Sequence, residues 1–149
     1  MKIGIDARLP GYRMGGISRY VIQLISALLA MNDDAEYVVY QSVKDAGDHF
    51  PADSNMTLKK LLTPCHHRYE RQLLTLELLG ERLDIFHSPD FIPPLRGAPR
   101  HVITVHDLNF LYYPQFLTKE SRRYYADQIG WAVNHADHVI ADSEHTRQD

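Results

Sequence analysis

The chain has 149 residues, of which 44% are hydrophobic and 23% charged, and its formal net charge is −3. These values are typical of one globular domain and argue against a disordered, fibrous or repeat protein. The charge offers no broad basic field, so no nucleic acid is expected as a partner.

Cys65 is the only cysteine, which excludes a disulfide within the chain and favours a reducing, cytoplasmic compartment. The first residues lack the apolar core and the cleavage site of a signal peptide. No run approaches the roughly 20 apolar residues that span a bilayer. We therefore expect a soluble protein that at most attaches to a membrane surface.

The chain begins with the order strand, glycine loop, helix. Residues 3–7 are predicted to form a strand, and residues 8–16 a loop that is rich in glycine. Apolar residues then recur at helical spacing on one face: Ile17, Tyr20, Val21, Leu24, Ile25 and Leu28.

Short apolar runs continue to alternate with helical patterns. Further strands are predicted over residues 36–41, 56–62, 83–86, 101–105 and 138–141. Helical spacing covers residues 69–79, with Gly80 as the stop, and a longer helix is capped by Thr118. Ser143 has the features of an N-cap for a last helix, which reaches Asp149 without a C-cap.

This alternation predicts βαβ units, and hence an α/β fold with a doubly wound, mainly parallel, Rossmann-like sheet. With six strands, four helices and no break in composition, residues 1–149 are expected to form one domain. Because a final helix of about six residues seldom closes a domain, we expect the chain to be truncated in that helix.

Polar residues follow several of the predicted strands. In an open parallel sheet, ligands bind at the carboxyl ends of the strands, so these residues would line one edge of the sheet. They are Gly15 and Gly16 in the first loop, His87 to Asp90, His106 and Asp107, and Asp142 to Glu144.

The two glycines at the start of the first helix have two interpretations. They allow a diphosphate to approach free amide groups at the positive end of the helix dipole, or they serve a tight turn only. The segment from Gly11 to Ser18 is spaced like a Walker A loop, but Ile17 stands where lysine is required, which disfavours an ATPase. The absence of G-x-G-x-x-G disfavours a dinucleotide dehydrogenase.

The sequence offers no persuasive metal site. His66 and His67 are adjacent, and His135 and His138 are three apart, but no cysteine or glutamate set completes a familiar metal centre. Solvated or core histidines are the simpler interpretation. No Asp-x-Asp is present, so no metal is expected to hold a nucleotide diphosphate.

His106 and Asp107 are the best candidates for chemistry. A histidine after a buried strand can donate to a sugar hydroxyl or to developing charge, and an adjacent aspartate can bind hydroxyls or accept a proton. The competing interpretation is a structural turn that contains a satisfied histidine.

Four segments together resemble the N-terminal domain of family 4 glycosyltransferases, which are retaining enzymes of GT-B architecture. The resemblance covers essentially the whole chain with the motifs in the right order. Its segments are Gly15 to Tyr20 (GGISRY), Asp84 to Pro93 (DIFHSPDFIP), Thr104 to Asp107 (TVHD) and Val139 to Arg147 (VIADSEHTR).

The resemblance implies roles for single residues. Gly15 and Gly16 match the loop that lies against the donor diphosphate without a metal, and His106 matches the histidine that reaches the transferred sugar. Asp107 is given a role in acceptor binding or positioning. Further acceptor contacts are expected at His87, Asp90, Ser143, Glu144 and Arg147.

The implied partners are a nucleotide-diphosphate sugar and a glycan or lipid-linked acceptor, as in polysaccharide biosynthesis. The family's C-terminal domain supplies the basic pair that neutralises the leaving diphosphate, and we expect that domain to be absent from residues 1–149. We therefore expect the fragment alone to be inactive. The rival hypothesis is a noncatalytic carbohydrate-binding or interaction module that keeps only the acceptor domain.

Two surface features have open interpretations. Aromatic residues after His106 either stack on a sugar, meet a lipid surface or simply pack a loop. An apolar face left by the missing domain is expected to promote self-association. The aromatic residues are Phe110, Tyr112, Tyr113 and Phe116.

Overall fold

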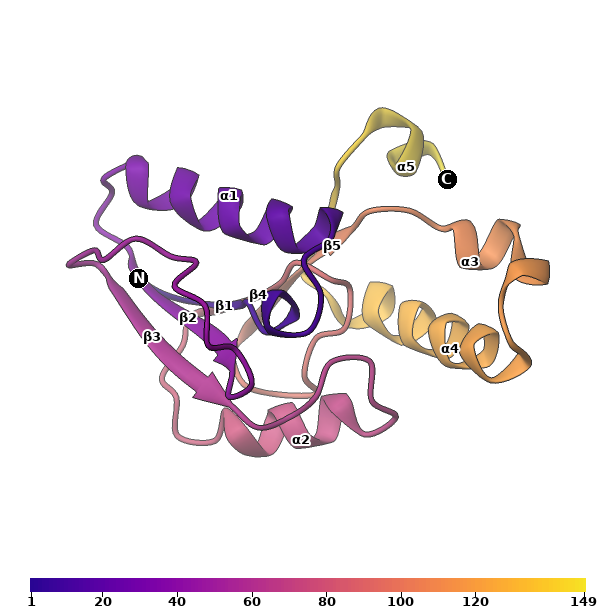
Figure 1. Cartoon of the computed structure of the whole chain (residues 1–149), viewed down its shortest axis with the longest axis horizontal. Coiled ribbons are helices and arrows are strands. Elements are labelled where there is room, and N and C mark those ends of the chain that lie inside the picture. The colour runs from indigo at the N-terminus through magenta and orange to yellow at the C-terminus, as the bar shows by residue number, and fades with distance from the viewer.

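Six parallel strands form one sheet with helices on both faces, in a computed structural model that describes all residues 1–149 (Figure 1). In chain order the strands are β1 (Lys2–Asp6), β2 (Glu36–Ser42), β3 (Met56–Leu61), β4 (Ile85–Ser88), β5 (Arg100–Val105) and β6 (His138–Ala141). The helices are α1 (Gly16–Ala30), α2 (Glu70–Glu77), α3 (Asn109–Tyr112), α4 (Lys119–His135) and α5 (Glu144–Gln148). Single 3-10 turns lie at Leu9–Gly11 and Pro114–Phe116.

The strand order is β3-β2-β1-β4-β5-β6, and every neighbouring pair is parallel. The chain therefore winds outward from β1 to β3, returns to β4, and winds the other way to β6. This reversal between β1 and β4 is where doubly wound sheets open a crevice at their carboxyl ends. The predicted doubly wound, Rossmann-like α/β fold is confirmed, and it is consistent with one half of a GT-B architecture.

The alternation of side chains in β2 explains why both faces of the sheet are covered. Tyr37 and Val39 belong to the cluster around α1, whereas Val38 and Tyr40 belong to the cluster around α2. All four are almost fully buried. Successive side chains of a strand point to opposite faces, so the run of four apolar side chains in β2 requires a helix on each side.

Helix α4 completes the same face as α2, below the sheet in Figure 1, while α1 lies above it. Ile129 and Ala132 of α4 pack on Ile103 and Val105 of β5. At the opposite edge, β3 exposes much of its length and carries Lys59, which pairs with Glu81. A charged edge strand discourages pairing with another chain.

The predicted helix boundaries agree with the structure where a capping residue marks the end of the helix. Thr118 and Ser143 accept hydrogen bonds from the backbone amides of Ser121 and Thr146, each at 3.1 Å, as N-caps do. Gly80 has φ of +86°, the left-handed conformation that favours glycine after a helix.

The structure differs from the predicted loops at two places. Residues 8–16 include the 3-10 turn Leu9–Gly11, and α3 with the turn Pro114–Phe116 occupies the aromatic segment. These elements are too short to show helical periodicity in the sequence. No helix combines the length and the apolar character that a membrane span needs.

Candidate functional site

His106 lies directly after β5, at the carboxyl edge of the sheet, and its ring is held on three sides. Its Nδ1 lies 3.0 Å from Oδ2 of Asp142, and its Nε2 lies 2.8 Å from the carbonyl oxygen of Pro89. The ring of Tyr20 in α1 meets it edge to face, with centroids 4.9 Å apart. Both hydrogen-bond partners are acceptors, so a neutral imidazole can donate to only one of them at a time.

Strand register explains why Asp142 is the partner of His106. Val105 and Ala141 are paired between β5 and β6, so the residues that follow them leave the sheet side by side. The hydroxyl of Thr146 in α5 also donates to the carbonyl oxygen of His106 at 3.0 Å. The end of β5 is thus tied to both the end of β6 and the start of α5.

Asp107 has a different environment from its neighbour. Its Oδ1 accepts a hydrogen bond from the backbone amide of Asn109 at 2.9 Å, which supports the turn into α3. The carboxylate that touches the His106 ring is therefore Asp142, while Asp107 lies beside His106 on the wall of a small cavity.

That cavity has a volume of about 150 Å³ and is bounded by the ends of β4 and β5, the start of α1 and helix α4. It brings two histidines together, each with a carboxylate partner: His106 with Asp142, and His66 with Asp90. Its lining residues are Ile17, His66, Asp90, Phe91, His106, Asp107, Phe110 and Tyr125.

His66 reaches the cavity from the segment between β3 and α2. Its Nε2 lies 2.7 Å from Oδ2 of Asp90, and its Nδ1 lies 3.2 Å from the hydroxyl of Tyr125. The hydrogen bond with Asp90 raises the pKa of His66 because it favours the charged ring. The backbone of His66 has φ of +57°, in the left-handed region that few residues other than glycine adopt.

A buried ionic cluster holds this segment in place. Arg8 makes a bidentate contact with Asp6, at 2.9 and 2.7 Å, and also donates to Glu70 at 2.6 Å and to the carbonyl oxygen of Thr63 at 2.8 Å. Glu70 in turn accepts from the backbone amide of His66 at 2.6 Å. The cluster therefore links the end of β1, the start of α2 and the segment that carries His66.

His87, a predicted acceptor contact, lies in β4 and does not line the cavity. Its side chain is buried, and its Nε2 lies 2.9 Å from the hydroxyl of Thr104. Burial lowers the pKa of His87 to about 4 because the charged ring would lose its hydration. At neutral pH it is therefore an uncharged, buried group.

Gly15 and Gly16 begin α1, with Gly15 as the N-cap. Neither has positive φ, and a Cβ atom added to either would meet nothing within 4 Å. Neither backbone conformation nor packing within the domain therefore requires glycine at these positions. The open space beside free helical amide groups is what a bound anion would need.

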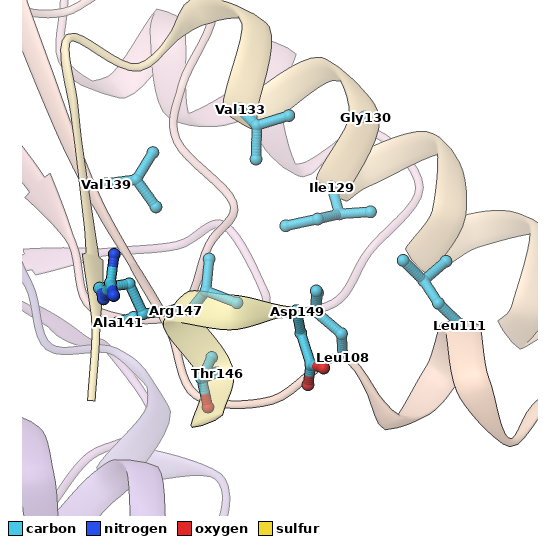
Figure 2. A pocket seen from close by; sticks show the side chains of 11 residues that line it. Leu108, Leu111, Ile129, Gly130, Val133, Val139, Ala141, Thr146, Arg147 and Asp149 are labelled. Carbon is cyan, nitrogen blue, oxygen red and sulfur yellow. The ribbon is translucent and has the colours of Figure 1, made fainter. Parts of the chain in front are cut away.

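The predicted residues at the start of α5 do not line the 150 Å³ cavity. Ser143 caps the helix, and Glu144 forms an exposed ion pair with Arg147, whose Nε lies 2.7 Å from Oε2. Arg147 borders a different hollow of about 610 Å³, which lies between β6, α4 and α5 (Figure 2). The side chains of Val133, Val139 and Ile129 face into that hollow, which is mainly apolar.

The aromatic segment after His106 divides between two hollows. Phe110 lines both the 150 Å³ cavity and an adjoining hollow of about 530 Å³, and Tyr113 and Phe116 line only the larger one. Tyr112 is exposed and lines neither of them. No three His, Cys, Asp or Glu side chains gather closely enough to hold a metal ion.

Two groups at the site, His66 and Tyr125, fall outside the predicted set. Asp142 is among the polar residues expected at this edge of the sheet, but its contact with His106 is not predicted by the sequence. For His66 and Tyr125 the sequence gives no signal, because they come from a polar segment and from the middle of a helix, 59 residues apart.

The model of Glycosyltransferase Family 4 matches residues 14–149. No curated protein matches the chain in sequence. The matched region contains the glycine start of α1, His106 and the whole cavity, and the observed parallel α/β sheet agrees with it. The chain therefore belongs to Glycosyltransferase Family 4.

Proposed function

We propose that the chain is the acceptor-side domain of a retaining glycosyltransferase. It would act in the transfer of a sugar from a nucleotide-diphosphate donor to a glycan or a lipid-linked acceptor. Family membership supports the transferase class. The observation that carries the proposal is a cavity that both His106 and Asp90 line. It lies next to the open start of α1.

The donor diphosphate would lie against Gly15 and Gly16. The first amide groups of a helix have no partner within the helix and carry partial positive charge, so they suit an anion. Because the helix start supplies this charge, the proposal requires no metal. A side chain at either glycine would occupy the space that the phosphates need.

His106 would contact the sugar that is transferred. In the proposed reaction the bond between the anomeric carbon and the diphosphate oxygen breaks, and the acceptor oxygen bonds to the same face of that carbon. The acceptor proton passes to the leaving phosphate oxygen. To bind a sugar hydroxyl, Nε2 of His106 has to exchange its contact with Pro89, since that nitrogen already has a partner.

Acceptor contacts would come from Asp90 and Asp107 in the cavity wall, and from Ser143, Glu144 and Arg147 at the start of α5. His87, a candidate acceptor contact by sequence, would instead hold the hydroxyl of Thr104 in place. A cytoplasmic location, beside a membrane where the acceptor is lipid-linked, suits these substrates.

We expect the 149-residue chain to turn over little donor by itself. The glycine loop provides only backbone amides for the diphosphate, and the cationic side chains that the resemblance assigns to a second domain supply most of the charge stabilisation.

The test incubates the purified chain with a panel of nucleotide-diphosphate sugars and with neutral glycan acceptors, and measures both binding and product. The proposal predicts donor binding without appreciable product. Robust transfer would contradict the expected inactivity. Binding of glycans without any response to nucleotide-diphosphate sugars would instead favour a noncatalytic carbohydrate-binding module.

A further inference from the structure

We propose that the 150 Å³ cavity binds one uncharged sugar ring of the acceptor, stacked on Phe110 and Tyr125 and hydrogen-bonded by Asp90 and the Tyr125 hydroxyl. In this assignment His66 is the positioning residue that holds both polar groups. The inference rests on the proposed function and deepens it, because it names the chemical class of the acceptor unit at this site.

The size and the wall of the cavity suit a single ring. Its volume is well below the roughly 300–1,000 Å³ of pockets for drug-sized ligands. Phe91 and Phe110 stack with centroids 5.5 Å apart, and the Phe110 and Tyr125 centroids are 5.7 Å apart. The negative faces of such rings attract the polarised C–H groups on the flat side of a sugar.

The polar groups of the cavity leave capacity for sugar hydroxyls. Asp90 uses Oδ2 to contact His66, and its Oδ1 has no hydrogen-bond partner in the protein. The hydroxyl of Tyr125 contacts only Nδ1 of His66. An ionised carboxylate can only accept, so Asp90 selects a ligand that donates, such as a sugar hydroxyl.

His66 links these two groups and is itself firmly held. One ring nitrogen faces Asp90, and the other faces Tyr125. The left-handed backbone of His66 is kept by the hydrogen bond from its amide to Glu70. Such conformations persist only where the surroundings over-determine them, and they concentrate at ligand sites.

Charge excludes the anionic alternatives. The cavity lining includes the carboxylates of Asp90 and Asp107 and contains no lysine or arginine. The guanidinium of Arg8, which faces the His66 ring, is already paired with Asp6 and Glu70. A phosphate or a uronate placed here would therefore lie close to these carboxylates without an unpaired permanent cation to offset the repulsion. The acceptor unit in the cavity is therefore uncharged, and any phosphate of a lipid-linked acceptor lies outside it.

The test follows amide shifts of the ¹⁵N-labelled chain during titration with methyl glucoside, methyl galactoside and methyl mannoside. Glucose 1-phosphate and methyl glucuronide are the anionic probes. We expect at least one neutral glycoside to shift Asp90, Phe110 and Tyr125, and the anionic probes to bind at least tenfold more weakly. Preference for an anionic probe, or neutral sugars that shift residues elsewhere only, would overturn the inference.

Matched variants distinguish the contribution of the Tyr125 hydroxyl to binding from that of its ring. Tyr125→Phe keeps the stacking surface and is expected to weaken binding of the neutral glycoside about 2- to 10-fold. Asp90→Asn is expected to weaken the same binding about 10-fold or more. Tyr112→Phe removes the hydroxyl of an exposed tyrosine that lines no part of the cavity. This variant should therefore bind the glycoside with the affinity of the wild type. Amide spectra of the free variants verify that each is folded. Equal affinities for all four proteins would overturn the inference.

The role of His66 has its own readout, the dependence of binding on pH. The groups that face this ring are Asp90 after β4, Glu70 of α2, Arg8 after β1 and Tyr125 of α4. A protonated ring donates from Nδ1 to Tyr125 and frees the phenol proton for the sugar, whereas a neutral ring accepts that proton. Wild-type affinity should therefore change as His66 titrates, and His66→Gln should abolish that change. An unaltered pH profile in His66→Gln would contradict the positioning role.

The inference and the proposed function can fail separately. Response of Gly15 and Gly16 to a nucleotide-diphosphate sugar, combined with silence of the cavity toward every glycoside, would overturn this inference alone. Silence toward both classes of ligand would contradict both. Binding of a glycoside in the cavity without any donor response would retain the sugar site and overturn the transferase proposal.

Discussion

The ring of Tyr20 presses its edge against the ring of His106, with centroids 4.9 Å apart. Tyr20 lies one helical turn after Gly16, so this contact fixes the start of α1 beside the end of β5. The hydroxyl of Tyr20 also lies 3.4 Å from that of Thr104 in β5. The glycine loop and His106 are therefore parts of one rigid edge.

Gly16→Ala should separate stability from ligand binding. Because the added methyl group meets no neighbour and the residue is helical, we expect the free energy of unfolding to stay the same or rise by up to about 1 kcal/mol. The methyl group would fill the proposed phosphate space, so donor affinity should fall. Urea unfolding and donor titration measure the two effects.

Gly130→Ala is the matched control for this experiment. Gly130 is also helical, and a Cβ there also meets nothing within 4 Å, but it lies in α4 away from the glycine loop. It should stabilise the chain without changing donor affinity. Equal donor affinity in Gly16→Ala and Gly130→Ala would argue against a phosphate site at α1.

Arg8→Met should destabilise the chain by about 3–5 kcal/mol, because Asp6 and Glu70 would remain buried without their cation. Urea unfolding measures this change. Arg123→Met, at a side chain that is 87% exposed, should change stability by less than about 0.5 kcal/mol. Similar losses in the two variants would show that the buried cluster does not hold the segment of His66.

Acid should destabilise the chain through His87. Its folded-state pKa of about 4 lies below the ordinary 6.5, so the unfolded chain binds the proton more readily. Stability from this group is complete above pH 6.5 and is lost as pH falls toward 4, by roughly 3 kcal/mol. His87→Gln should flatten that part of the pH profile of unfolding. Parallel profiles for the variant and the wild type would contradict this assignment.

His66 should titrate in the opposite sense. The Asp90 contact raises its pKa above 6.5, so the stability that it contributes is present below pH 6.5 and is lost as pH rises through the folded-state value. Ring signals followed by NMR across this range report the midpoint. In Asp90→Asn the midpoint should move down toward the ordinary value, and an unchanged midpoint would show that Asp90 does not set it.

Local rules predict most of the fold. The apolar runs mark the boundaries of all six strands to within two residues, and side-chain caps at Thr118 and Ser143 fix the starts of α4 and α5. The four residues of α3 escape prediction because they make a single turn, which is too short to show helical periodicity.

The site is only partly predictable. That His106 lies at the ligand edge follows from its place after a buried strand. Its contact with Asp142 depends on the register of β5 against β6, which cannot be read from the sequence. His66 reaches the cavity through the Arg8 and Glu70 cluster, a set of contacts between segments 62 residues apart. Sequence spacing alone carries no information on such contacts.

The most direct test of the account is titration of a nucleotide-diphosphate sugar into the ¹⁵N-labelled chain, with the amides of Gly15, Gly16 and His106 observed together. The account predicts that all three shift with one common dissociation constant, because the start of α1 and the end of β5 form one edge. Silence at both glycines with every nucleotide-diphosphate sugar would contradict it.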